Sequence, residues 1–387
     1  MRTVNLIVNI TRRLWLTFFY LEDFMAYSNK YNKEEYIEKK KEEIDKLESI
    51  LKDGVKEVFS SGKWKEFLDT MSKFYNYSPR NCMLIKRQLP TASLVASFRE
   101  WNKEFERTVN KGEKALYILA PIQKKYNQIV KDADGKPLKD ENGYDLTKEV
   151  KRIAFKSVPV FDISQTSGKE LPTIALKLEK DFEDKDKYNA FLRGLIQLAP
   201  VPVSFEQFKS NADGYYSPTE QKIVVQKDLS EYQKIGTLIH EMAHSMLHNP
   251  KLNKDISKLT NQDMEVQAES LAYIVCKHFG IDTSQYSFGY VASWSKNEKN
   301  LEEKFSKVLN PVKELASEII TKMEDNFEHN LEKVKLQNKY MQVYQDERLS
   351  DYEKHLIYLN AIKGIDTSYY DDYDKSYINE AYDCMEL

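Results

Sequence analysis

The chain has 387 residues, of which 31% are charged and 41% hydrophobic, and its formal net charge is −3. These values are typical of a globular protein, and the length is sufficient for two domains. The near-neutral charge argues against a chain that binds nucleic acid over its whole surface, so any such binding must be local. Three scattered cysteines, Cys82, Cys276 and Cys384, argue against a disulfide framework or a Cys-based zinc site and favour the reducing cytoplasm.

Residues 1–25 form an N-terminal extension of uncertain status. The apolar segment 6–24 is interrupted by Arg12 and Arg13, so it makes a poor membrane span, and it lacks the cleavage site of a signal peptide. We therefore expect no membrane partner, and a translation start at Met25 is the better interpretation of this segment.

The hydrophobic pattern of the first half predicts helices followed by strands. Residues 34–75 have helical periodicity, and residues 114–120 form a short apolar strand ended by the following proline. Residues 132–145 are rich in Asp, Gly and Asn and predict a hairpin tip before a second strand, 152–163. We therefore expect an α+β domain over residues 26–170.

A second domain is expected over residues 171–300, after a linker at 168–180. Its predicted elements are a helix at 188–198, a pair of strands at 214–216 and 223–225, and helices at 231–248 and 261–279. Ser230 and Gln233 form a capping box that begins the first of the two helices that follow the strands.

The helix at 231–248 contains the sequence His240-Glu241-Met242-Ala243-His244. Residues four apart lie on one face of a helix, so the two imidazoles can bind one ion, expected to be Zn²⁺. Glu241 is rotated by about 100° and can act as general base towards a water molecule at the metal. His248 lies about 12 Å along the axis from His240, too far to share that ion, and is expected to be a structural or supporting residue. This arrangement predicts metal-assisted hydrolysis of amide bonds.

A catalytic zinc ion needs a third protein ligand from another element, and the following helix offers Asp263, Glu265 and Glu269. Glu265 shares its face with Ala268 and Ala272, small residues that allow close helix approach, so we choose Glu265 as the ligand. Glu269 is expected to hold an imidazole N–H in place.

Tyr215 and Tyr216 fit either an edge strand that receives an extended peptide or ordinary strand packing, which is the commoner role.

Residues 70–99 contain no Asp or Glu but carry basic residues among aromatic ones. Such a mixture holds single-stranded nucleic acid, although a folded surface whose aromatic residues belong to the core has the same composition. The candidate contacts, including three residues that extend this basic window, are Arg80, Lys86, Arg87, Trp101, Lys111 and Lys114.

Several motifs resemble the N-terminal domain of ArdC antirestriction proteins. They are RNCMLI at 80–85, QLP at 88–90, Trp101, KGEK at 111–114 and VFDISQT at 160–166. Further on, TLIHEMAH at 237–244 and EVQAE at 265–269 are similar to the metallopeptidase half of ArdC and to the ImmA/IrrE peptidases. The resemblance covers residues 50–300.

This resemblance implies a domain that binds single-stranded DNA, fused to a gluzincin-like zinc metallopeptidase domain and encoded on a mobile genetic element. It supports Glu265 as third ligand of one zinc ion. Two functions stay open: a DNA-coupled metalloendopeptidase that cleaves a repressor or DNA-associated protein, and a non-catalytic antirestriction protein that protects single-stranded DNA and has a structural zinc.

Residues 301–387 lie outside the resemblance and are expected to be helical, with an acidic end. Residues 369–387 contain six acidic residues and one lysine. A solvated terminus explains this composition more readily than a DNA mimic does.

Overall fold

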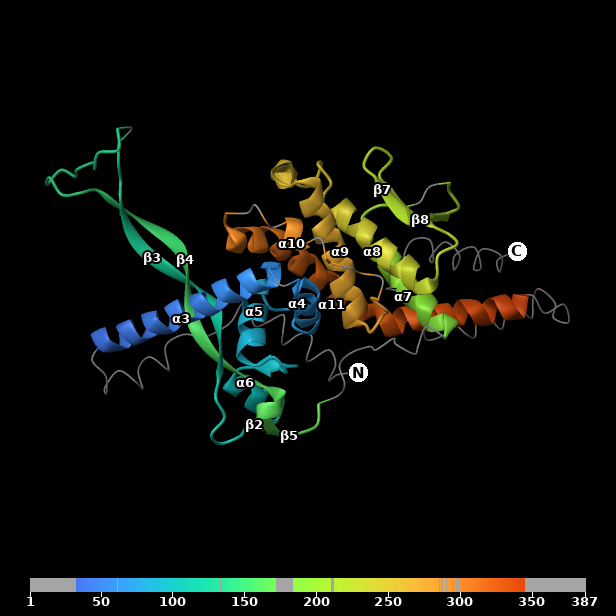
Figure 1. The fold of residues 1–387 in the computed structure, drawn as a ribbon, viewed down its shortest axis with the longest axis horizontal. Helices are drawn as coiled ribbons and strands as arrows, with labels where there is room; N and C mark the ends of the chain where they lie inside the picture. Colours follow the sequence, from blue (N-terminus) through green and yellow to red (C-terminus); the bar gives the residue numbers. More distant parts are fainter. Residues whose placement is uncertain are drawn as a thin grey trace, which may run out of the picture.

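The computed structural model describes residues 33–344, with gaps at 61, 133, 172–183, 210–211, 285, 287, 290, 295 and 297–298 (Figure 1). The expectations for residues 1–25, for most of the linker and for the acidic tail fall outside the described residues. Within them the protein has a mixed α+β architecture, as expected.

The elements of the first half are helices followed by a hairpin of two long strands. They are α3 (Lys33–Ser60), α4 (Trp64–Lys73), α5 (Pro79–Gln88), β1 (Val95–Ala96), α6 (Phe98–Lys103), β2 (Arg107–Val109), β3 (Leu116–Ile129), β4 (Thr147–Asp162), the 3-10 turn η1 (Ile163–Gln165) and β5 (Thr166–Gly168).

The second half consists mainly of helices around a small sheet. Its elements are α7 (Lys185–Leu198), β6 (Val203–Glu206), β7 (Gly214–Ser217), β8 (Lys222–Gln226), α8 (Glu231–Leu247), η3 (Lys254–Lys258), α9 (Asn261–His278), α10 (Val291–Trp294) and α11 (Leu301–Tyr344). None of the helices in the described part of the chain is both long and apolar enough to cross a bilayer.

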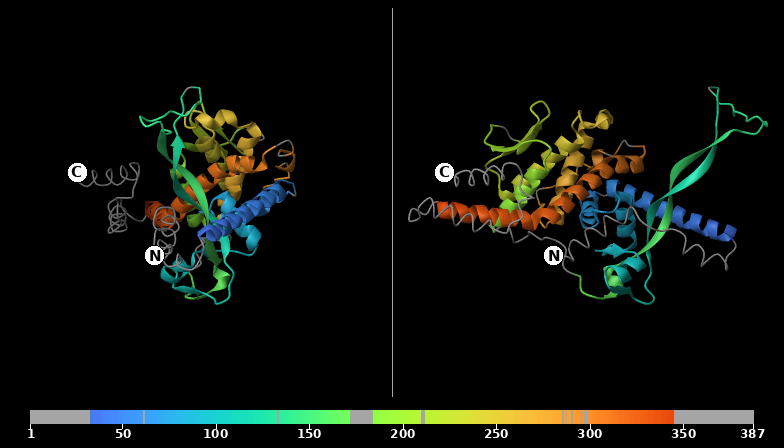
Figure 2. Two further views of the ribbon diagram at one scale, coloured as in Figure 1. Left: turned by 90° about the vertical axis from the view of Figure 1, so that its left-hand side faces the viewer. Right: turned by 180° about the vertical axis from the view of Figure 1, so that it is seen from behind.

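Strands β3 and β4 form a ribbon that projects from the helical body (Figures 1 and 2). Their antiparallel register runs from Leu116 opposite Val160 to Ile129 opposite Thr147. The expectation that the first strand ends at Pro121 is wrong, because β3 continues through it. Strand β3 lies at the edge of the sheet β1-β4-β3, where a residue without an N–H is tolerated.

The expected hairpin tip between these strands is confirmed and contains two tight turns. The side chain of Asp132 accepts hydrogen bonds from the amides of Asp134 and Lys136. In the next turn, the side chain of Asp140 accepts from the amides of Asn142 and Tyr144. Gly135 and Gly143 have φ angles of 81° and 83°, which L side chains rarely adopt. The sequence of each turn therefore fixes its local geometry.

One hydrophobic core joins the N-terminal helices to the second half of the chain. Trp64 on α4 is completely buried and donates a hydrogen bond to Ser270 on α9 over 3.1 Å. Tyr273 on α9 donates to Asp69 on α4 over 2.6 Å. Helix α4 therefore supports α9, one of the two helices of the candidate site.

The small sheet has the order β6-β8-β7, with β8 parallel to β6 and antiparallel to β7. The expected pair of strands is confirmed as β7 and β8, whereas β6 was not predicted. Both β7 and β8 pack against α8, which places the edge strand β7 beside the helix of the metal-binding motif.

Candidate metal centre

Helix α8 presents the motif because both its start and its buried face are well defined. Ser230 and Gln233 form the predicted capping box. Ile235, Leu238 and Ile239 are completely buried, so the apolar stripe fixes the rotation of the helix in the core. The predicted helix is thus confirmed.

His240, His244 and Glu265 meet between α8 and α9. The two Nε2 atoms of the histidines lie 3.1 Å apart, and each lies 3.5 Å from one carboxylate oxygen of Glu265. Bonds of 2.0–2.2 Å to a tetrahedral zinc ion place its ligand atoms about 3.3–3.6 Å apart. The donor set and its spacing therefore fit one metal ion, and the three residues form a candidate metal site.

The centre is open to solvent on one side. The side chains of His240 and His244 are 22% and 20% exposed, whereas that of Glu265 is 53% exposed. A site that is closed by the histidines and open beside the carboxylate leaves room for a water molecule or substrate next to the ion, which a catalytic centre requires.

The charges of the centre favour the metal-binding forms of Glu265 and His244 but not that of His240. Burial alone would lower the pKa of His240, but the hydrogen bond to Glu265 and the charge of Glu241 outweigh burial and raise it. The hydrogen bond from His240 holds the pKa of Glu265 below its usual value. Burial, followed by the charge of His240, lowers the pKa of His244 to about 4. A carboxylate and a neutral imidazole are the forms in which these residues bind metal.

Glu241 lies beside this centre and is only 7% exposed. Burial raises its pKa, while the charge of His240 and a hydrogen bond from the Tyr216 backbone act in the opposite direction. A carboxylate whose pKa is moved towards neutral is a more effective general base. The position fits the role expected for Glu241.

Strand β7 approaches Glu241 closely because Gly214 has no side chain. A Cβ atom at Gly214 would lie 2.6 Å from Cγ2 of Thr237, 3.0 Å from the carbonyl oxygen of Val224 and 3.4 Å from Cγ of Glu241. We expect Gly214→Ala to displace β7 from α8 and to destabilise the fold by about 1–3 kcal/mol. Thermal unfolding measures this effect.

The matched control is Gly289→Ala, since a Cβ atom there meets no atom within 4 Å. An equal melting temperature for the Gly214→Ala variant and the parent would contradict the close approach.

His248 stays outside the metal triangle and contacts one of its members. Its Nδ1 lies 3.0 Å from Nδ1 of His244, and its Nε2 lies 2.8 Å from Oε1 of Gln267. The supporting role expected for His248 is thus consistent with its position, and burial lowers its pKa. The sequence analysis missed Gln267, although a glutamine between Val266 and Ala268 in a buried helix is a signal. The hydrogen bond expected between Glu269 and an imidazole N–H stays a prediction.

Trp101 and several aromatic residues of the basic window belong to the interior. Trp101 is completely buried and donates a hydrogen bond to the carbonyl of Phe161 over 2.8 Å. Phe74 is 4% exposed, and Tyr77 packs against the main core. In this fold the Trp101 ring is therefore not on a surface where bases could stack.

Two of the predicted basic contacts are engaged with the protein itself. Arg87 forms an ion pair with Glu57, and Lys86 donates to the carbonyl of Glu66 over 3.1 Å. The Cζ atom of Arg80 lies 5.8 Å from the ring centre of Phe155.

Lys111 and Lys114 are exposed in the turn before β3. Arg80, Lys111 and Lys114 therefore lie along the base of the ribbon and not around the metal centre.

The ribbon carries basic residues that the sequence analysis missed. Two successive cross-strand pairs consist of cations only: Lys124 lies opposite Arg152, and Lys125 lies opposite Lys151. One acidic neighbour, Glu149, forms an ion pair with Lys125 over 3.0 Å. The signal was present in the adjacent basic residues of both strands, but their opposition depends on a register that the sequence alone does not give.

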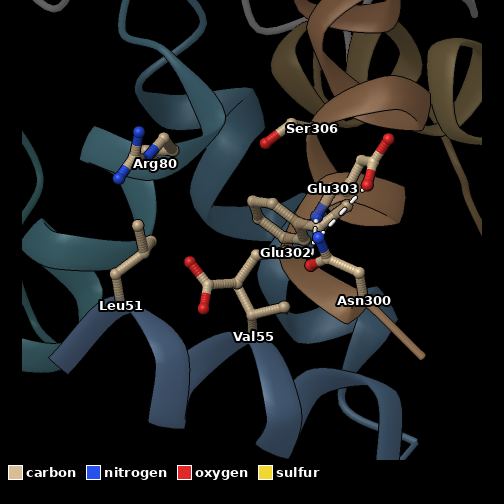
Figure 3. Close-up of a pocket in the computed structure, with 8 residues that line it drawn as sticks. Leu51, Val55, Arg80, Asn300, Glu302, Glu303 and Ser306 are labelled. Carbon is tan, nitrogen blue, oxygen red and sulfur yellow. Dashed lines mark hydrogen bonds between the residues drawn. The ribbon is translucent and has the colours of Figure 1, made fainter. Parts of the chain in front are cut away.

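A cavity of about 410 Å³ lies between α3, α5 and the start of α11 (Figure 3). Its lining includes Arg80, Glu302 and Glu303, and it contains none of the three candidate metal ligands. It is therefore separate from the metal centre.

Two family models match this chain. Residues 33–161 match the N-terminal domain of anti-restriction factor ArdC, and residues 198–287 match the IrrE N-terminal-like domain. The matches define an ArdC-type domain followed by a domain with a peptidase-like fold. The two matches confirm the predicted fusion of an ArdC-like N-terminal domain with an IrrE-like, peptidase-type domain.

The chain is also similar to an uncharacterized Bacillus anthracis protein, pXO2-81/BXB0111/GBAA_pXO2_0111, with 31% identity over 342 residues. That match covers 80% of this chain and 57% of the relative, so the chain spans just over half of the relative's length.

Among solved structures, the metal-free antirestriction protein ArdC from plasmid R388 matches with a TM-score of 0.40 and 18% identity, over 65% of this chain and 86% of that one. The Mn(II)-bound form of the same protein matches with a TM-score of 0.43 and 16% identity, over 73% and 98%.

Proposed function

We propose that this protein is a zinc-dependent metalloendopeptidase of a mobile genetic element, coupled to binding of single-stranded DNA. The observation that carries the proposal is the convergence of His240, His244 and Glu265, with Glu241 beside them. Glu241 is the one of these four residues that is not a proposed metal ligand. A buried carboxylate in this position can act as the general base if the site hydrolyses amide bonds.

The proposed reaction adds water across a peptide bond. His240, His244 and Glu265 would hold a zinc ion, whose Lewis acidity would polarise the peptide carbonyl and make a water molecule at the site more acidic. Glu241 accepts the proton of the attacking water and returns it to the nitrogen of the leaving amine. The carbon–nitrogen bond then breaks, giving one carboxyl and one amino terminus.

A protein substrate fits the edge of the small sheet. Within the described part of the chain, strand β7 pairs with β8 on one side only, and Tyr215 in β7 is 39% exposed. An extended peptide can add to such an edge through main-chain hydrogen bonds. Because β7 packs against α8 and the backbone of Tyr216 in β7 donates a hydrogen bond to Glu241, a peptide on this edge would lie next to the proposed base.

The ribbon supports the proposed binding of single-stranded DNA. Like charges directly opposite each other destabilise a sheet, so the two cation pairs of β3 and β4 favour a bound polyanion that offsets their repulsion. Side chains alternate between the two faces of the ribbon, so Tyr126 lies on the face of Lys124, and Ile153 and Phe155 lie on the face of Lys125. These three side chains are 44%, 71% and 43% exposed. Cations that bind phosphates, interleaved with exposed aromatic and apolar side chains, suit unpaired bases.

The alternative function is an antirestriction protein that protects single-stranded DNA without catalysis and has a structural metal. Closed coordination is typical of structural zinc. The half-exposed Glu265 and the presence of Glu241 favour the enzyme.

The test is cleavage of unfolded casein by metal-free protein, by the same protein after addition of one equivalent of Zn²⁺ or Mn²⁺, and by each form with a single-stranded oligonucleotide. We expect cleavage only with metal. Metal binding and oligonucleotide binding without cleavage of any protein tested would instead support the non-catalytic function.

A further inference from the structure

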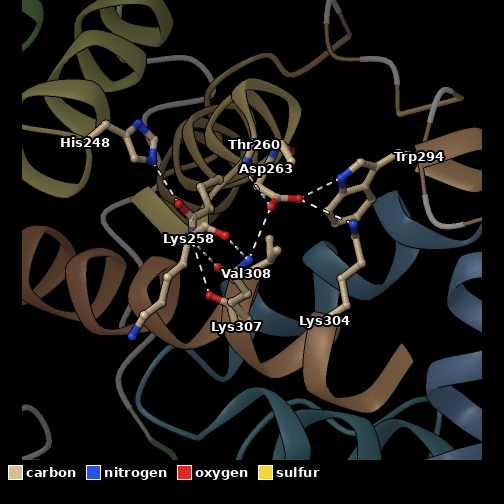
Figure 4. Close-up of polar contacts among 9 residues, drawn as sticks. His248, Lys258, Thr260, Asp263, Trp294, Lys304, Lys307 and Val308 are labelled. Carbon is tan, nitrogen blue, oxygen red and sulfur yellow. Dashed lines mark hydrogen bonds and ion pairs between the residues drawn. The ribbon is translucent and has the colours of Figure 1, made fainter. Parts of the chain in front are cut away.

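Gln267 is a buried amide that links the metal centre to helix α11. It is 1% exposed, and its Oε1 lies 2.8 Å from Nε2 of His248. On its other side Nε2 donates to the carbonyl oxygens of Lys307 and Val308 over 3.3 and 3.2 Å (Figure 4). The side chain of Gln267 thus connects His248, at the end of α8, to helix α11.

One of these carbonyl groups is open because of a proline. In an α-helix the carbonyl of residue 307 would accept from the amide of residue 311, but Pro311 in α11 has no N–H. A buried carbonyl without a partner is costly. The amide of Gln267 therefore fills a position that Pro311 leaves free.

This contact determines which way the amide of Gln267 points. Carbonyl oxygens only accept hydrogen bonds, so the atom that faces Lys307 and Val308 must be the NH₂ group. The oxygen of Gln267 then faces His248, and Nε2 of His248 must carry a proton to donate to it.

The same reasoning extends from His248 to the candidate metal ligand His244. His248 is 6% exposed and its ring nitrogens contact two uncharged partners, so its neutral form is favoured and its Nδ1 is an acceptor. Nδ1 of His244, 3.0 Å away, must then donate. That leaves Nε2 of His244 without a proton, facing Nε2 of His240 across the metal site.

We propose that Gln267 and His248, oriented by the carbonyl that Pro311 leaves free, are positioning residues that hold His244 in the tautomer able to bind metal. The proposal rests on the proposed metal site. It extends that site from α8 and α9 to α11, which lies outside both family matches.

The position of α11 along α9 is fixed by a second buried contact. Asp263 is 3% exposed, accepts from Nε1 of Trp294 over 2.9 Å, and lies 3.4 and 3.5 Å from the amines of Lys304 and Lys307 (Figure 4). These two lysines lie on the turn of α11 that also presents the carbonyls to Gln267. The carbonyl groups of Lys307 and Val308 are therefore held in a fixed position relative to α9, the helix that carries Glu265 and Gln267.

The test uses the full chain, labelled with ¹⁵N-histidine and free of metal, so that ¹⁵N chemical shifts report the tautomer of each imidazole. Signals are assigned by single histidine substitutions. We expect His244 protonated at Nδ1 in the parent and a mixture of tautomers in Gln267→Met. Competition with a chelator then measures the dissociation constant for Zn²⁺, which we expect to rise about 10- to 100-fold in the variant.

The matched control is Gln88→Met, since Gln88 also bonds main-chain carbonyls but lies on α5, away from the metal centre. We expect parental tautomers and zinc affinity in this variant. His244 protonated at Nε2 in the metal-free parent would overturn the proposal without any variant, as would unchanged tautomers and affinity in a folded Gln267→Met.

The tautomer is read without metal and without substrate. A protein with the expected tautomer that cleaves nothing would therefore overturn the proposed peptidase and leave this inference standing.

Discussion

Glu241→Gln is expected to slow peptide-bond cleavage about 100- to 10,000-fold while leaving the metal content of the protein unchanged. Glutamine has nearly the shape of glutamate but cannot accept the proton of the attacking water. Glu241 lies beside the metal triangle and not among its ligands, so the change leaves His240, His244 and Glu265 in place. The loss should therefore fall on the chemical step.

The measurement is the rate of casein cleavage together with zinc content, for the parent, Glu241→Gln and Glu318→Gln. Glu318 is a matched control because it is 48% exposed and pairs with Lys322 on α11, away from the centre. A Glu241→Gln protein that binds one zinc ion and cleaves at the parental rate would exclude Glu241 as the base. If the zinc is structural, neither cleavage nor DNA protection should depend on this residue.

The convergence of the three candidate ligands could be predicted only in part from helix geometry. The spacing of His240 and His244 fixes their common face, and the small residues around Glu265 indicate which face of α9 approaches α8. Gln267 could not be predicted in the same way, because its role depends on the carbonyl freed by Pro311 on α11. Such a contact exists only after three helices have packed.

The fold shows the same division between local and long-range signals. Capping residues and turn glycines predicted the start of α8 and the hairpin tip, since those signals act within a few residues. The extension of β3 through Pro121 depends on that strand lying at a sheet edge, and the pairing of β6 with β8 joins strands separated by β7. Neither is encoded in a local pattern.

The basic window shows how composition alone leaves a surface undetermined. Its charges and aromatic residues suited a DNA-binding surface, but the fold places Trp101 and Phe74 in the interior. The opposed cations of the ribbon lie outside that window, at 124–125 and 151–152, and only the strand register places them opposite each other.

Replacing Lys124, Lys125, Lys151 and Arg152 by glutamine is expected to weaken binding of a single-stranded oligonucleotide about 100- to 1,000-fold near 0.1 M salt. Each cation that neutralises a phosphate on single-stranded DNA releases about 0.7 counterion, so the slope of log affinity against log salt should fall by about 3 in magnitude. Fluorescence anisotropy at several salt concentrations measures both quantities.

A control with the same change in net charge replaces Lys227, Lys322, Lys335 and Lys339, four exposed lysines outside the ribbon. Equal losses in both variants would indicate an effect of net charge only, and unchanged affinity in the ribbon variant would place the DNA elsewhere. Because like charges opposite each other destabilise a sheet, removal of the ribbon cations should leave the melting temperature equal or higher. A ribbon variant that binds DNA weakly and yet unfolds no earlier than the parent would show that these cations serve the ligand and not the fold.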